Sequence, residues 1–121
     1  LPGHVNNPFP LLRQADLFVN SSTAEGFGLT LAEAMTLGIP VAATYTAGVS
    51  AALSDGGNGY VAGGFSVDCI EALLNRALDD PEREHVAKQG QKFSQERYGV
   101  EGMVQRYENL YKRLTSEPAK K

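Results

Sequence analysis

The hydrophobic positions of this 121-residue chain alternate between short apolar runs and longer segments with helical spacing. The runs predict strands over residues 16–21, 41–44 and 60–62, and the run at 41–44 is typical of a strand buried on both faces of a parallel sheet. The other segments predict helices over residues 9–15, 29–37, 47–53, 67–78, 81–97 and 100–114. Strands that alternate with helices indicate an α/β fold with a doubly wound parallel sheet.

Local signals indicate where several of these segments begin and end. Ser66 is a suitable N-cap for the helix that follows it, and Asp80 is a second N-cap with Pro81 at the first helical position. Gly90 predicts a break or a weak point in that second helix. We assign residues 1–116 to one domain and residues 117–121 to a frayed tail.

The last predicted helix carries an apolar stripe along one face. The stripe comprises Val100, Met103, Val104, Tyr107, Leu110, Tyr111 and Leu114. Such a stripe usually packs against a protein core, and we expect the same here. The alternative is a face that meets a membrane or a partner.

One stretch combines a strand, a glycine loop and a helix start. The apolar run of residues 17–19 leads into a small polar turn, and Gly28 precedes the helix predicted over 29–37. The first amides of a helix lack internal partners and carry partial positive charge, so they can bind an anion. Glu25 lies in the loop and Glu33 lies about one turn into the helix. Amides and carboxylates together suit a ligand that has both phosphate and hydroxyl groups.

The same stretch also has a plainer interpretation. Glu33 can be an ordinary solvated residue of a helix, while Gly26 and Gly28 can serve only to make a turn. A glycine loop by itself is a weak signal of function, so these residues alone leave both interpretations open.

Charge is distributed unevenly along the chain, although the net charge is only −3. Residues 1–80 contain eight acidic side chains but only two basic ones, Arg13 and Arg76. This acidic balance argues against nucleic-acid binding and means that side-chain cations for a phosphate-bearing ligand must come from elsewhere. Cys69 is the only cysteine, which excludes an internal disulfide and a cysteine-based metal site. We expect Cys69 to be a small core residue.

Composition and hydropathy place the chain among soluble globular proteins. Apolar residues make up 42% and charged residues 21% of the sequence. No apolar run approaches the length of a membrane span, and no signal peptide is visible. We therefore expect a cytoplasmic location, and the start at Leu1 suggests a fragment. Membrane contact would come only through a part of the protein missing from this chain.

Four motifs together resemble one family. Residues 25–35 read EGFGLTLAEAM, and shorter motifs lie at residues 13–19, 38–44 and 55–61, the last of them a D-G-x-N-G loop. They resemble the retaining GT-B glycosyltransferases of the group 1 family, also called family four. The hallmark of that family is a pair of glutamates with seven residues between them. The likeness runs from Gly3 to about Leu114.

The resemblance implies a fold and a reaction. The chain would be the Rossmann-like, three-layer C-terminal domain of a GT-B fold, truncated on its N-terminal side. It would hold a nucleotide-diphosphate sugar for retaining transfer, of a hexose by expectation, without a metal or other cofactor. The unknown acceptor would bind the missing N-terminal domain, so the isolated chain would be inactive. The alternatives are a non-catalytic fragment or paralogue that binds a nucleotide sugar, and an unrelated nucleotide-binding α/β domain.

The resemblance also implies roles for individual residues. Glu25 would contact hydroxyls of the donor sugar and act in catalysis, whereas Glu33 would bind the ribose of the nucleotide. The whole donor-binding segment comprises Glu25, Gly26, Phe27, Gly28, Leu29, Thr30 and Glu33. His4 and Val5 are candidates for the nucleobase side, although we favour a surface or capping role for His4. Tyr45 stands where the family often has a small polar residue, so donor preference stays open.

Overall fold

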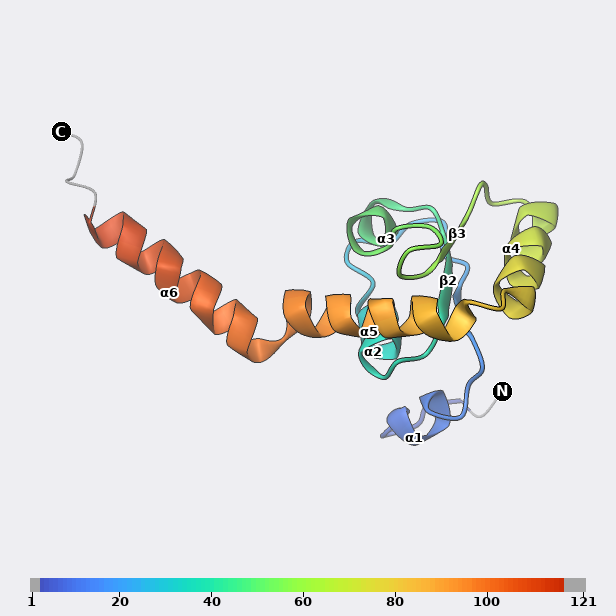
Figure 1. Cartoon of the computed structure of the whole chain (residues 1–121), viewed down its shortest axis with the longest axis horizontal. Helices are drawn as coiled ribbons and strands as arrows, with labels where there is room; N and C mark the ends of the chain where they lie inside the picture. The colour runs from blue at the N-terminus through green and yellow to red at the C-terminus, as the bar shows by residue number, and fades with distance from the viewer. Residues whose placement is uncertain (1–2, 117–121) are drawn as a thin grey trace.

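A computed structural model describes residues 3–116 as a small α/β body followed by a projecting helix (Figure 1). Its strands are β1 (Phe18–Asn20), β2 (Val41–Thr44) and β3 (Tyr60–Ala62). Its helices are α1 (Phe9–Leu12), α2 (Leu29–Thr36), α3 (Ala47–Ala52), α4 (Val67–Asp79), α5 (Arg83–Tyr98) and α6 (Val100–Ser116). The predicted tail at residues 117–121 lies outside the described residues.

The three strands form one parallel sheet in the order β1-β2-β3. Phe18 pairs with Val41 on one side of the central strand β2, and Ala42 pairs with Tyr60 on the other side. All four residues of β2 are buried. This arrangement confirms the parallel α/β sheet that the apolar run at 41–44 predicts.

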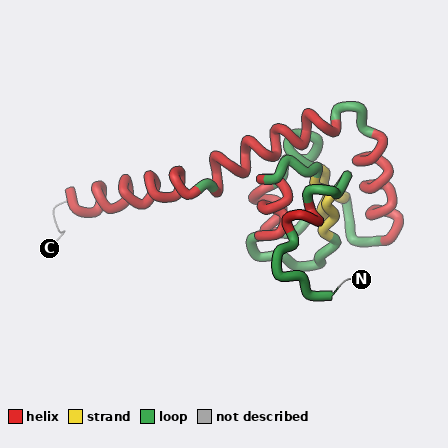
Figure 2. The backbone as a smooth tube through the Cα atoms, turned by 90° about the horizontal axis from the view of Figure 1, so that it is seen from below, coloured by secondary structure: helices red, strands yellow, loops and turns green. Residues whose placement is uncertain are grey.

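Side chains of β2 alternate between two hydrophobic cores, one on each face of the sheet. Val41 and Ala43 belong to a core built with residues of α2 and α3, whereas Ala42 belongs to a core built with residues of β3, α4 and α5. Figure 2 shows the strands enclosed between helices. The domain therefore has the expected three layers.

Polar contacts hold α2 against α5. The buried hydroxyl of Ser94 donates to the carbonyl oxygen of Ala32 at 3.0 Å and lies 2.7 Å from the hydroxyl of Thr36. The side-chain amide of Gln91 donates to the carbonyl oxygen of Thr36 at 3.1 Å. These contacts matter for the site, because α2 carries Glu33 on its outer face.

Several predicted boundaries are wrong by a few residues. Helix α1 ends at Leu12 and β1 is confined to residues 18–20, so both elements are shorter than predicted. Helix α5 begins at Arg83, not at Pro81, because the carboxylate of Asp80 accepts the amide of Glu82 at 2.8 Å within a preceding turn. The predicted cap at Ser66 is confirmed, since its hydroxyl accepts the amide of Cys69 at 3.3 Å.

Gly90 does not break helix α5, contrary to the prediction. The helix continues from Arg83 to Tyr98, and Gly90 is buried in its middle. A Cβ atom at this position would lie 2.7 Å from the carbonyl oxygen of Asn58. The glycine thus permits close packing of α5 on the α3–β3 loop, which offsets its low helix propensity.

Helix α6 projects from the domain, and its apolar stripe is exposed (Figure 1). The expectation that this stripe packs into the core is wrong, because the described residues place no layer against it. Cys69 is likewise only half-buried, since the buried face of α4 begins one turn later at Leu73. No helix within residues 3–116 has the length and apolar character needed to cross a membrane.

Candidate functional site

The candidate site begins at the carboxyl end of β1, where Asn20 organises the loop that follows. Its side-chain oxygen accepts the amide of Ser22 at 2.9 Å, and its side-chain nitrogen donates to a carboxylate oxygen of Glu25 at 3.3 Å. The hydroxyl of Thr44, at the end of β2, donates to the carbonyl oxygen of Ser22. The loop is therefore fixed to two neighbouring strands at the edge where parallel α/β sheets usually bind ligands.

Glu25 is half-buried, and its backbone is held by α3. The amide of Gly48 donates to the carbonyl oxygen of Glu25 at 3.0 Å. A Cβ atom on Gly48 would lie 2.8 Å from that oxygen and 2.9 Å from the carbonyl group of Gly26. Position 48 therefore admits only glycine without a shift of the loop, and α3 helps to place Glu25.

The start of α2 is exposed and lacks a side-chain cap. Gly28 occupies the N-cap position in the left-handed conformation, with φ of 72°. It supplies no side-chain acceptor for the first amides of the helix, and Leu29 next to it is 68% exposed. Free amides and the helix dipole at an accessible helix start can bind an anion, as the sequence predicts.

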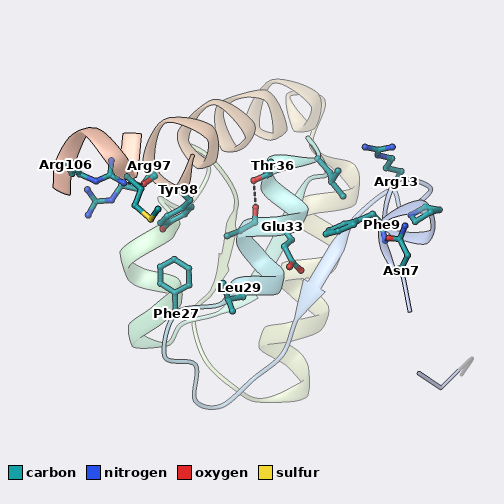
Figure 3. Close-up of a pocket in the computed structure, with 14 residues that line it drawn as sticks. Asn7, Phe9, Arg13, Phe27, Leu29, Glu33, Thr36, Arg97, Tyr98 and Arg106 are labelled. Atoms are coloured by element: carbon teal, nitrogen blue, oxygen red, sulfur yellow. Dashed lines mark hydrogen bonds between the residues drawn. The ribbon is translucent and has the colours of Figure 1, made fainter. Parts of the chain in front are cut away.

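Glu33 lies on the outer face of α2 and lines a groove of about 740 Å³ (Figure 3). Helix α1 borders one end of the groove, and the junction of α5 and α6 borders the other. The lining residues are Asn7, Phe9, Pro10, Arg13, Phe27, Leu29, Ala32, Glu33, Thr36, Leu37, Arg97, Tyr98, Met103 and Arg106. The groove thus combines apolar walls with one carboxylate and three guanidinium groups.

The arginines of the groove come from elements that are distant in the sequence. Arg13 follows α1, Arg97 lies at the end of α5 and Arg106 lies in α6. The guanidinium of Arg106 donates to the carbonyl oxygen of Arg97 at 2.7 Å, which ties the two helices together. The charge asymmetry of the sequence predicts only that cations come from elsewhere, and it does not identify these three residues of the chain itself.

Aromatic contacts close the groove at the helix junction. The ring of Tyr98 lies edge-on to Phe27 at 5.1 Å and to Phe93 at 5.9 Å between ring centroids. Phe27 belongs to the predicted donor-binding segment and is still 50% exposed. The end of α5 therefore supports the glycine loop at Phe27.

Other predicted site residues lie apart from this groove. His4 is exposed and Val5 is half-buried, and both lie outside the groove lining. Their proposed contact with a nucleobase stays a prediction. Tyr45 is 61% exposed directly after β2, so its ring is accessible to a ligand at the carboxyl edge of the sheet.

The D-G-x-N-G loop at residues 55–59 has a structural role. Asn58 is buried, where its side chain accepts the amide of Ser54 at 2.7 Å and donates to the carbonyl oxygen of Ala52 at 3.1 Å. Asp55 accepts two hydrogen bonds from the guanidinium of Arg76 at 2.7 and 2.9 Å. These bonds hold the pKa of Asp55 below its ordinary value. The ion pair of Asp55 with Arg76 therefore fixes this loop to α4.

Within residues 3–116, no group of three or more His, Cys, Asp or Glu side chains is arranged to hold a metal ion. The predicted metal independence of the reaction is not tested by this observation and stays a prediction.

Comparisons with known protein families, relatives and solved structures agree on one family. Residues 1–93 match the family model described as Glycosyl transferases group 1. The lipopolysaccharide 1,2-N-acetylglucosaminetransferase of Salmonella typhimurium is 37% identical over 100 residues, which cover 81% of this chain and 26% of that protein. The chain thus spans about a quarter of the length of this relative.

Solved structures agree with this match. HepE of Anabaena, in complex with UDP and glucose, superposes with a TM-score of 0.73 at 25% identity over 88% of this chain and 29% of HepE. The C-terminal domain of a glycosyl transferase group 1 family protein from Francisella tularensis gives a TM-score of 0.70 at 27% identity. That match covers 83% of this chain and 52% of the domain.

Proposed function

Because the chain belongs to the glycosyl transferases group 1 family and its α/β body superposes on part of GT-B glycosyltransferases, we propose that it is the donor-binding part of a retaining glycosyltransferase. Its donor is a nucleotide-diphosphate sugar. The observation that carries the proposal is the arrangement around α2, where Glu25 precedes an uncapped helix start and Glu33 faces the groove. Sugar hydroxyls, diphosphate oxygens and ribose hydroxyls of the donor can therefore be bound by Glu25, by the helix-start amides and by Glu33, respectively.

The groove suits the nucleotide. Glu33 can accept hydrogen bonds from two ribose hydroxyls, and the apolar walls can cover the faces of the ribose and base. Arg13 at one end of the groove and Arg97 and Arg106 at the other add positive charge, which favours a ligand with negative phosphate groups. HepE holds UDP and glucose, which supports a nucleotide sugar as the ligand of this family member.

The glycine loop suits the diphosphate and the sugar. The amides at the start of α2 can bind the diphosphate oxygens and support the negative charge that develops when the diphosphate leaves. Glu25 can hold sugar hydroxyls and so orient the anomeric carbon towards the acceptor. We propose that the binding of the donor and its transfer proceed without a metal ion.

The acceptor belongs to another part of the enzyme in this proposal. The chain covers only about a quarter of its curated relative, and α6 projects away from the donor-binding body (Figure 1). We propose that an N-terminal GT-B domain binds the acceptor and completes the active site. The isolated chain is then a donor-binding module.

The anomeric configuration of the product tests the retaining reaction. A full-length enzyme that contains this chain is supplied with UDP-glucose and other nucleotide sugars of known configuration, and the anomeric configuration of the new linkage is assigned by proton NMR. We expect the product linkage to keep the configuration of the donor. An inverted linkage would contradict the proposal, as would the absence of transfer from every nucleotide sugar.

A further inference from the structure

We propose that Asn20 is a positioning residue for Glu25. Its side-chain amide holds one carboxylate oxygen of Glu25 and leaves the other oxygen for a hydroxyl of the donor sugar. This inference rests on the proposed function, since it gives a reason for the orientation of the glutamate that the sugar meets. Asn20 itself contacts the carboxylate and acts through it.

The hydrogen-bond partners settle which way the amide of Asn20 points. The backbone amide of Ser22 can only donate, so the atom that faces it at 2.9 Å is the side-chain oxygen of Asn20. The side-chain nitrogen is then left facing Glu25, whose ionised carboxylate can only accept, at 3.3 Å. Both ends of one planar amide are therefore used, and the amide cannot be reversed without loss of both bonds.

Rigid structure surrounds this amide. Asn20 pairs with Ala43 in the parallel sheet, and its carbonyl oxygen accepts the hydroxyl of Thr44 at 3.5 Å. The backbone of Glu25 is fixed from the other side by the amide of Gly48. Since the strand holds Asn20 and α3 holds the backbone of Glu25, the bond between their side chains fixes the remaining freedom of the carboxylate.

The donor to Glu25 is neutral, and this matters for the chemistry. An amide orients the carboxylate and leaves its negative charge largely uncompensated, whereas a guanidinium would neutralise it. Within residues 3–116, only one of the two carboxylate oxygens of Glu25 has a hydrogen-bond partner. The second oxygen can accept a sugar hydroxyl, and the retained charge can stabilise positive charge that develops on the sugar ring.

Asn20→Asp is the sharpest single variant, because it keeps the shape and the acceptor for Ser22 but replaces the donor to Glu25 with a second carboxylate. We expect repulsion to turn Glu25 away from its position. In the full-length enzyme, transfer from UDP-glucose or the preferred donor should fall by about a hundredfold, as expected for a misplaced reacting group. Affinity for free UDP should stay within about twofold, since Glu33 and the groove are untouched.

The double variant Asn20→Asp/Glu25→Gln separates positioning from simple stability. Here the amide and the carboxylate exchange places, so the hydrogen bond can form again with donor and acceptor reversed. We expect the melting temperature to recover towards that of the parent enzyme. Transfer should stay as low as in Glu25→Gln alone, because position 25 no longer carries a carboxylate. Asn75→Asp, on the exposed side of α4, is the matched control for the added charge.

Results that overturn the role of Asn20 can be told apart from results that overturn the proposed function. If Asn20→Asp transfers sugar normally while Glu25→Gln does not, the positioning role of Asn20 is overturned and the proposed function stands. Recovery of transfer in the double variant would show that the pair matters only for stability, which also overturns the inference. If Glu25→Gln itself transfers normally, the sugar role of Glu25 is wrong and the role of Asn20 falls with it.

Discussion

Two loops of this domain carry an acidic residue among glycines, and their carboxylates are in opposite situations. In the α3–β3 loop, both oxygens of Asp55 are occupied, by two hydrogen bonds from Arg76 and one from the amide of Val61 at 2.8 Å. In the β1–α2 loop, Glu25 accepts one hydrogen bond from a neutral amide at 3.3 Å. Both loops belong to motifs that resemble the same family.

The difference gives a physical criterion that separates a carboxylate occupied by the fold from one that is free to bind a ligand. A carboxylate that is paired with a guanidinium and a backbone amide has little capacity left for a ligand. A carboxylate that is oriented by one neutral donor keeps an oxygen and most of its charge for a ligand. By this criterion Asp55 stabilises the fold, whereas Glu25 is available for chemistry.

The largest expected effect, on glycosyl transfer, comes from separating the domain that carries the β1–α2 loop from the rest of the enzyme. The 121-residue chain alone should show no glycosyl transfer, because the acceptor domain of our proposal is absent. The assay supplies several nucleotide sugars and candidate acceptors, with a full-length enzyme as the positive control. Turnover above background by the chain alone would contradict the division of the site between two domains.

Glu33→Gln should weaken the binding of UDP and of UDP-glucose equally in the full-length enzyme. Both ligands share the ribose, and a hydrogen bond to a charged acceptor contributes about 1.5–3 kcal/mol. The affinity should therefore fall roughly ten- to a hundredfold by calorimetry. Glu71→Gln, on the exposed face of α4, is the matched control. Unchanged affinity for UDP in Glu33→Gln would refute the assignment.

Gly48→Ala should disturb the β1–α2 loop by pressing on the backbone of Glu25 and Gly26. The added Cβ would lie 2.8 Å from the carbonyl oxygen of Glu25, so α3 or the loop must shift. We expect a loss of about 1–3 kcal/mol of unfolding free energy, as for other overpacked sites. Gly63→Ala is the control, because a Cβ there meets no atom within 4 Å. Equal melting temperatures for the two variants would show that the loop is not held as described.

The smallest expected effect concerns Tyr60 in β3, whose contribution to stability changes only at alkaline pH. Burial and the hydrogen bond to Asp80 raise the pKa of Tyr60 from 10.0 to about 12. Stability from this shift is present below pH 10 and is lost as the pH rises through about 12, since the unfolded chain ionises first. Urea unfolding at pH 9 and pH 11 should show this loss, and Tyr60→Phe should reduce it. An identical alkaline loss in that variant would rule out Tyr60 as its source.

Much of this fold follows from local patterns in the sequence. The bounds of β2 and β3 agree with the apolar runs that predicted them, because strands in a buried parallel sheet need apolar side chains on both faces. The cap at Ser66 and the glutamate pair were also visible as short-range patterns. These features depend on residues that are close together along the chain.

What the sequence did not reveal depends on residues that are distant from each other. The apolar stripe of α6 has the pattern of a core helix, but the pattern does not say what covers it. Helix propensity alone predicts a weak point at Gly90, whereas the close packing of Gly90 against the carbonyl oxygen of Asn58 decides its role. Arg13, Arg97 and Arg106 line the same groove as Glu33 only in the folded chain, so no local motif could identify the groove.

The central claim is that Glu25 serves the donor sugar, and one set of measurements on Glu25→Gln tests it most directly. Melting temperature, affinity for UDP and transfer rate are measured for the same full-length variant, beside Asp55→Asn. We predict that Glu25→Gln loses transfer while its melting temperature and UDP affinity stay close to the parent values. Asp55→Asn should keep transfer and lose less than about 1 kcal/mol of stability, since its ion pair is half exposed. A parallel fall of all three quantities in Glu25→Gln would contradict the claim and make Glu25 a structural acid like Asp55.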